Sequence, residues 1–173
     1  MTSFNINLYL FLENLLFFLV ATFFIVVVGW TWRQAEPFSL PELLPGWFKI
    51  WFGTVQLLGI LLPLVVMLVW GVWWGYGSVL SVLGWYLIML VLQITSEIVT
   101  LRQFHNVVWV MVPYLYLPYR FWQLYEGLTI LGSANDLLWV KNLLAWELVL
   151  WILNYALDIT QLPRLLRWKI KEN

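Results

Sequence analysis

Several ionisable and amide side chains in the second half of this chain lie within stretches that are otherwise apolar. Such groups cost at least a few kcal/mol at the centre of a bilayer unless they are paired or hydrated. Glu147, Asn154 and Asp158 recur at helical spacing, so they share one helix face. We therefore predict that polar groups meet in a seam between helices, and its expected members are Gln93, Glu97, Arg120, Glu126, Glu147 and Asp158.

Arg120 and Glu147 are the first candidates for an ion pair in this seam, because both are expected near mid-membrane on consecutive helices. Two interpretations of the seam remain open. In the structural one, ion pairs lock the helices together. In the functional one, Glu97 and Glu126 join Arg120 and Glu147 in lining a hydrated path or a ligand cavity. Acids outnumber bases in the seam, so at least one Glu could be protonated, which would suit either interpretation.

The tryptophans suggest a second kind of site. The chain has 14 of them, and most are expected in interfacial belts or packing contacts. Trp47 and Trp51 lie beside a proline-rich segment, and Trp139, Trp146 and Trp151 follow one another along the last apolar stretch. These rings could instead wall a site for a flat, apolar ligand.

Catalytic and metal-binding motifs are not found in the sequence. There is no HExxH, GxSxG or P-loop pattern, so we expect a protein that is not an enzyme. With one histidine and no cysteine, no metal site made of protein groups alone is expected. His105 could be an axial ligand to a haem or a chlorophyll, or a polar anchor at a helix boundary. Nine basic and nine acidic residues balance, so we expect no nucleic-acid partner.

The elements that position these residues can be inferred from a long charge-free stretch. Residues Ile50–Ser96 include no Asp, Glu, Lys, Arg or His. As a single helix this stretch would be about 70 Å long, whereas the hydrocarbon core of a bilayer measures about 30 Å. It must therefore turn once, and Gly75–Ser78 is the natural place. This predicts two membrane-spanning helices.

The composition of the whole chain also indicates a membrane protein. Charged residues make up 10% of it, against about 25% in soluble domains. We predict an all-α, polytopic membrane protein with one transmembrane domain over residues 1–173 and five transmembrane helices. The alternative has four spans and one interfacial segment, at 107–131. No seam of small residues is apparent between the helices. The expected spans are 8–30, 51–74, 79–101, 107–131 and 137–158, with a long Pro- and Trp-containing loop at 31–50 and a basic tail at 159–173.

Orientation follows from the bias of Lys and Arg toward the cytoplasmic side. With five spans, Arg33, Lys49, Arg102 and the cations of the tail all lie on the side of the C-terminus. We therefore expect the N-terminus outside and the C-terminus in the cytoplasm.

The last apolar stretch contains Leu144-Ala145-Trp146, six further residues, and Leu153-Asn154-Tyr155. This pattern resembles the last helix of the TspO/MBR family, the translocator proteins or tryptophan-rich sensory proteins. Gly84, Tyr86, Leu90, Leu92 and Gln93 resemble its third helix, where an Asn is usual at the position of Gln93. The Asn-x-x-Trp that this family carries on its third helix is missing from this chain.

The resemblance implies a small helical receptor or carrier that binds tetrapyrroles such as protoporphyrin or haem, or sterol-like lipids. It also implies a pocket beneath the first loop, and the residues that would line it are Trp47, Trp51, Trp146 and Asn154. Trp151, one of the tryptophans that follow one another along the last apolar stretch, completes the expected ligand site.

Three functions are compatible with these features. The leading hypothesis is a binding protein or carrier for a large apolar ligand. The alternative is an accessory or assembly subunit of a larger membrane complex, whose partners are other membrane subunits or a second copy of the chain. The third is a small proton- or ion-coupled transporter, suggested by Glu97, Glu126 and Glu147 around Arg120.

Overall fold

The computed structural model describes residues 3–35, 46–132, 135–160 and 162–165. These residues are almost entirely helical and include no strand, so the predicted all-α class is confirmed. One long rod combines four consecutive elements: α2 Gly46–Gln56, a π-helical turn Leu57–Leu61, α3 Leu62–Val66 and a second π-helical turn Met67–Trp73. The other helices are α1 Ser3–Thr31, α4 Gly77–Phe104, α5 Val108–Leu131, α6 Leu138–Ile159 and the short α7 Leu162–Leu165, with a 3-10 turn at Asn135–Leu137.

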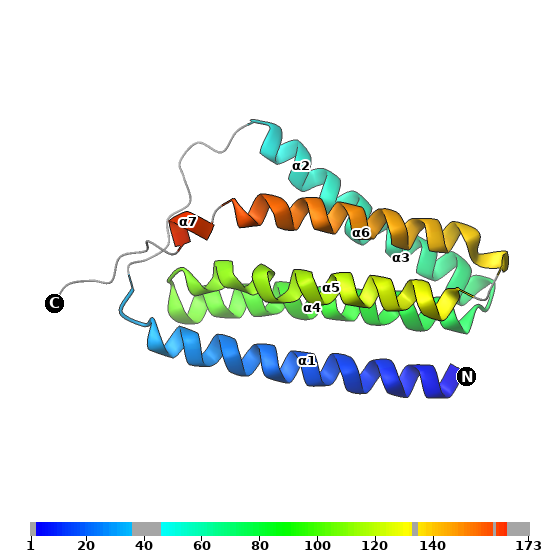
Figure 1. Ribbon diagram of the computed structural model, residues 1–173, viewed down its shortest axis with the longest axis horizontal. Coiled ribbons are helices and arrows are strands. Elements are labelled where there is room, and N and C mark those ends of the chain that lie inside the picture. Colours follow the sequence, from blue (N-terminus) through cyan, green and yellow to red (C-terminus); the bar gives the residue numbers. More distant parts are fainter. Residues whose placement is uncertain (1–2, 36–45, 133–134, 161, 166–173) are drawn as a thin grey trace.

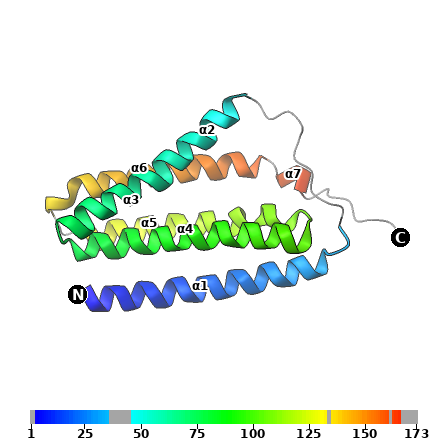
Figure 2. The ribbon, with the colours of Figure 1, turned by 180° about the vertical axis from the view of Figure 1, so that it is seen from behind.

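The five long rods run roughly side by side (Figure 1). Helices α4 and α5 occupy the middle, α1 lies along one side of them, and α6 and the rod that contains α2 and α3 lie along the other, as the opposite view also shows (Figure 2). α4 and α5 pack closely against each other, α5 also packs on α6, and α1 packs mainly on α4. The start of α1 and the end of α6 lie at opposite ends of the bundle.

Four helices in the described part of the chain are long and apolar enough to cross a membrane, and their bounds are Asn5–Thr31, Gly46–Trp73, Gly77–Phe104 and Leu138–Ile159. Helix α5 is not among them. It carries Pro113, Pro118, Arg120 and Glu126, and buried residues recur along its whole length. The helix with these two buried charged groups therefore lies in the middle of the bundle.

The helix boundaries agree with the expected spans to within a few residues, except at the first loop. Residues 46–50, which we expected in that loop, form the first turn of α2. Residues 36–45 of the loop and 161 and 166–173 of the tail lie outside the described part. The turn expected at Gly75–Ser78 is confirmed: Gly75 has φ +75°, and the amide of Tyr76 donates to the carbonyl of Trp70 at 3.0 Å.

Glycines allow close approach at several helix crossings, contrary to our expectation that no such positions would be found. A Cβ added at Gly127 would lie 2.6 Å from a methyl carbon of Val82, and one at Gly71 would lie 3.0 Å from the backbone of Leu80. Gly29 packs in the same way against the ring of Phe104. Small residues that let helix backbones approach are typical of helix contacts in membranes.

Asn106 joins three elements where α4 turns into α5. Its side-chain amide donates to the carbonyl of Trp32, just after α1, at 2.8 Å. Its side-chain oxygen accepts from the amide of Val108 at 3.0 Å, which satisfies a free N–H at the start of α5. Asn106 is 1% exposed. A buried polar contact thus fixes α1, α4 and α5 to one another at this end of the bundle.

Candidate functional site

A cavity of about 230 Å³ lies between α2, α4, α5 and α6. Figure 1 shows why it lies there: α2 leans away from the other helices toward its N-terminal end. Phe52 and Ile94 line the cavity and are also exposed on the outer surface, so its edge reaches that surface between α2 and α4. The polar groups that line it are Gln56, Gln93, Glu97, Arg120, Asn154 and Asp158; its aromatic residues are Phe48, Trp51, Phe52 and Trp151.

Arg120 lies deepest among these groups and is 1% exposed. Its guanidinium carbon lies 4.2 Å from the ring centre of Trp151 and 5.5 Å from that of Tyr86. This is the distance range of cation–π attraction. The guanidinium makes one hydrogen bond within the described residues, from Nη2 to the side-chain oxygen of Gln93 at 2.6 Å. Among those residues, Nε and Nη1 have no partner.

Gln93 connects the arginine to an acid. Its amide nitrogen donates to a carboxylate oxygen of Glu97, one helical turn later on α4, at 2.9 Å. One amide therefore uses its oxygen for Arg120 and its nitrogen for Glu97. This places the carboxylate of Glu97 close enough to offset part of the charge of Arg120, although the two groups do not touch.

Tyr86 holds in place the wall of the cavity that Trp151 and Arg120 form. Its hydroxyl accepts from the indole N–H of Trp151 at 2.8 Å and donates to the carbonyl of Gly59 at 2.6 Å. That carbonyl is available because Pro63, four residues later, has no N–H to give it. A carboxylate oxygen of Glu147 lies 3.4 Å from the same hydroxyl. The ring of Trp151 is therefore held by Tyr86 at its N–H and by Arg120 at its face.

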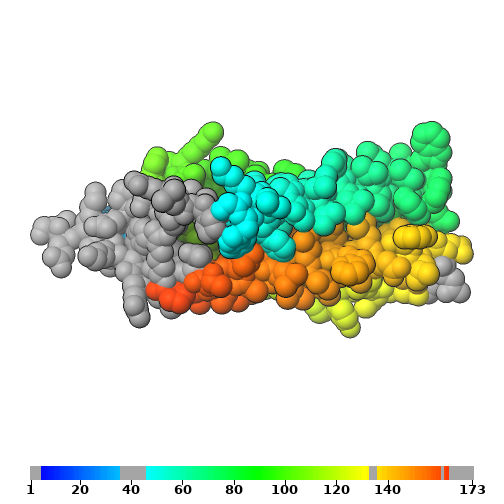
Figure 3. All heavy atoms as spheres, turned by 90° about the horizontal axis from the view of Figure 1, so that it is seen from above, coloured from blue at the N-terminus to red at the C-terminus, as the bar shows by residue number. Residues whose placement is uncertain are grey.

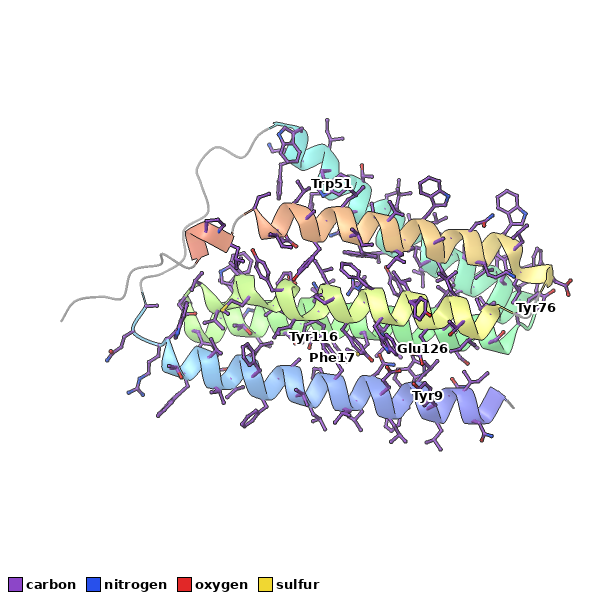
Figure 4. All side chains as sticks on the ribbon, in the orientation of Figure 1. Tyr9, Phe17, Trp51, Tyr76, Tyr116 and Glu126 are labelled. Atoms are coloured by element: carbon purple, nitrogen blue, oxygen red, sulfur yellow. The ribbon has the colours of Figure 1, made fainter. Side chains whose placement is uncertain are left out.

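The outer wall of the cavity is α2, which has few contacts with the rest of the bundle. Val55 is its one buried residue. Trp51 lies between α2 and α6 (Figure 4), and its indole N–H donates to the side-chain oxygen of Asn154 at 3.1 Å. Viewed from above, the rod that contains α2 and α3 lies beside α6 along the bundle (Figure 3). The cavity is thus closed on this side by a single helix, α2, which has few contacts with the other helices.

The structure brings seven of the expected site residues to this cavity, and they are Trp51, Gln93, Glu97, Arg120, Trp151, Asn154 and Asp158. Two tryptophans that we placed in the ligand site are not among them. Trp146 is 73% exposed on the outer face of α6 and Trp47 is 55% exposed on α2. The side chain of Trp139 is exposed as well.

The expected ion pair between Arg120 and Glu147 is not formed. Tyr86 lies against both groups, so the carboxylate of Glu147 meets the tyrosine hydroxyl and the guanidinium meets Gln93. The prediction placed both residues at one depth and could not include a ring from α4 between them. Both groups are buried, at 2% exposure for Glu147.

Glu126 belongs to a separate polar cluster between α1 and α5. It lies near Tyr9 (Figure 4) and also interacts with Glu13. In the same cluster, Asn14 accepts from Tyr119 at 3.1 Å and from Gln123 at 2.6 Å, and the indole of Trp122 donates to Glu13. The predicted single seam is therefore divided into two groups of polar residues on different sides of α5.

No metal centre is found in the described part of the chain, since no three His, Cys, Asp or Glu residues cluster there. His105 ends α4 in a left-handed conformation, with φ 51°, and its side chain is exposed. It does not line the cavity. An axial-ligand role for His105 would therefore place a haem outside this site.

Two residues on which the site depends, Tyr86 and Gly59, were not predicted as part of it. A signal was present: a tyrosine within a charge-free stretch needs a hydrogen-bond partner, and a proline frees the carbonyl four residues before it.

No protein-family model, curated protein or solved structure matches the chain.

Proposed function

We propose that this chain is an integral membrane protein that crosses the bilayer five times, with its N-terminus outside and its C-terminus in the cytoplasm. Four apolar helices of sufficient length support this. So do large apolar side chains on the outer face of α1, such as Leu16 and Phe23, which are 64% and 72% exposed. Apolar surface of this extent suits lipid better than water. In this arrangement α5, the fourth span along the chain, is the one added to the four apolar helices, and it packs against α1, α4 and α6.

Within the bilayer, the protein is a binding protein or carrier, not an enzyme, for a large and mainly apolar ligand such as a tetrapyrrole or a sterol-like lipid. The observation that carries this proposal is the cavity between α2 and the bundle, with aromatic and aliphatic walls and a few convergent polar groups. That combination is typical of small-molecule sites. The resemblance of Leu153-Asn154-Tyr155 and its surroundings to the TspO/MBR family agrees with it.

The size of the cavity bears on how such a ligand would bind. At about 230 Å³ it is smaller than the roughly 300–1,000 Å³ of sites that enclose a drug-sized ligand. A porphyrin would therefore bind only if α2 moved outward. The few contacts of α2, mainly Val55 and the bond between Trp51 and Asn154, make this the easiest helix to displace.

Titration with protoporphyrin tests the proposal. Tryptophan fluorescence of the purified protein in detergent should be quenched saturably, because Trp51 and Trp151 lie at the cavity. Trp51→Ala should weaken binding about tenfold, since it removes a ring and its hydrogen bond to Asn154. Trp146→Ala is the matched control: it removes an exposed indole outside the cavity and should leave the affinity unchanged. Quenching that rises without saturation would contradict the proposal.

A role as accessory or assembly subunit is the second candidate. It is favoured by the polar cluster between α1 and α5, part of which reaches the surface at membrane depth: Tyr9 is 51% and Trp122 is 49% exposed. Polar groups at such a surface suit contact with another membrane subunit or a second copy. The transporter alternative loses support because Glu97, Glu126 and Glu147 occupy three different surroundings.

A further inference from the structure

Arg120 is a buried charge with incomplete hydrogen bonding. A guanidinium keeps its charge at any ordinary pH and carries five N–H groups. This one is almost fully buried, and in the described part of the chain only Nη2 has an acceptor. Buried charges in proteins are normally paired and fully hydrogen-bonded, because leaving them otherwise is costly. The arrangement around Arg120 therefore lacks an acceptor.

No acid in the described part of the chain supplies the acceptor that Arg120 lacks. Glu147 lies against the hydroxyl of Tyr86, and Glu97 is bound by the amide of Gln93. Asp158 lines the cavity near the end of α6, where its backbone carbonyl accepts from Tyr114. Arg120 lies about three turns into α5, deeper than either Glu97 or Asp158. The open space beside Arg120 that could hold a further acceptor is the cavity, which this side chain lines.

The remaining walls indicate what else the occupant needs. Besides its polar groups, the cavity is lined by aliphatic and aromatic side chains, among them Ile60, Leu90, Leu117 and Leu157. Toward the surface it ends beside Phe52 and Ile94, which face the outside between α2 and α4. An apolar chain that entered there would meet Phe52 and Ile94 first and the aliphatic groups of the cavity further in.

From this geometry we infer that the cavity takes an amphiphile with an oxyanion head, a carboxylate or a phosphate, which accepts hydrogen bonds from the guanidinium of Arg120 while its apolar chain passes outward between α2 and α4. Guanidinium binds such oxyanions with strong, charge-assisted hydrogen bonds. The cavity of about 230 Å³ then encloses the head and the first part of the chain, and the rest lies in the bilayer. This inference rests on the proposed function, because it specifies the ligand class of the same site.

Contact quenching by a brominated fatty acid tests the inference on the full-length protein in detergent. The probes are 9,10-dibromostearic acid and its methyl ester, which differ only in the head and its charge. The acid should quench tryptophan fluorescence saturably and bind at least tenfold more tightly than the ester. Arg120→Gln should remove this preference, and Arg120→Lys, which keeps the charge, should retain part of it. Displacement of the acid by lysophosphatidic acid, but not by a monoacylglycerol with the same chain and no phosphate, shows that the site also accepts a phosphate head.

Two failures have different meanings. If acid and ester quench saturably with equal affinity, the oxyanion inference is overturned while the proposed function stands. If neither acid, ester nor protoporphyrin gives saturable quenching, the proposed function fails and this inference with it. Should Arg120→Gln not fold, the ratio of acid to ester affinity in the unmodified protein and in Arg120→Lys still tests the oxyanion inference.

Discussion

Leucine in place of Gln93 should destabilise the protein by about 3 kcal/mol, far more than the roughly 1 kcal/mol expected for an ordinary hydrogen bond. The reason is that Gln93 is the one hydrogen-bond partner of Arg120 within the described residues. Its loss leaves a buried charge without any acceptor, and removal of one member of a buried polar pair is much more damaging than replacement of both.

A second substitution should therefore restore stability. In the double variant Gln93→Leu, Arg120→Met, both partners are apolar and of similar volume to the originals. We expect its free energy of unfolding to lie within about 1 kcal/mol of that of the unmodified protein. The variant should nevertheless not distinguish the brominated acid from its ester, because the guanidinium is gone. Arg120 would then be a residue kept for its ligand at a cost to stability.

Unfolding by sodium dodecyl sulfate in mixed micelles, followed by tryptophan fluorescence, measures these effects. Gln123→Leu serves as the control, because Gln123 lies on α5 and donates to a neutral group, Asn14, at 2.6 Å. That variant should lose about 1 kcal/mol. If the effects of Gln93→Leu and Arg120→Met simply add, Arg120 stabilises the fold through contacts other than Gln93, and the coupling between the two side chains is refuted.

Valine in place of Gly59 should be the second most damaging change. A Cβ at this position would lie 2.7 Å from Cζ2 and 3.2 Å from Cε2 of Trp151. The indole cannot move away easily, because its N–H is bonded to Tyr86 and its ring lies on the guanidinium of Arg120. We expect a loss of about 3 kcal/mol, the upper part of the usual range for overpacking, together with weaker ligand binding.

Gly53→Val offers a matched comparison in the same rod. Nothing lies within 4 Å of a Cβ built at Gly53. Valine is also somewhat better than glycine in a helix, so this variant should stay within about 0.5 kcal/mol of the unmodified protein. The same unfolding measurement applies to both. Similar losses for the two variants would mean that valine acts through the helix backbone, with no role for the contact to Trp151.

The helices could be predicted from the sequence because apolar length and turn residues depend on local chemistry. The charge-free stretch and Gly75 located two rods and the turn between them correctly. Five of the residues that line the cavity followed from spacing on single helices: Trp151, Asn154 and Asp158 on α6, and Gln93 and Glu97 on α4. Such faces are set by the helical repeat alone.

The errors arose where neighbouring helices decide the outcome. Trp146 and Trp151 are five residues apart, which places them about 140° apart around a helix, so both could not line one cavity. Glu126 and Arg120 point to different sides of α5 for a similar reason. The separation of Arg120 from Glu147 by Tyr86 depends on how α4 packs, and no pattern within α5 or α6 contains that information.

The central claim, that the space between α2 and the bundle is a ligand site, is tested most directly by cysteine labelling. The chain has no cysteine, so a single one can be placed without background. Leu117 and Leu124 are both on α5 and both 1% exposed, but only Leu117 lines this cavity. We predict that Leu117→Cys reacts with N-ethylmaleimide, that 9,10-dibromostearic acid protects it, and that Leu124→Cys stays unreactive. Equal reactivity at the two positions, or no protection at position 117, would contradict the claim.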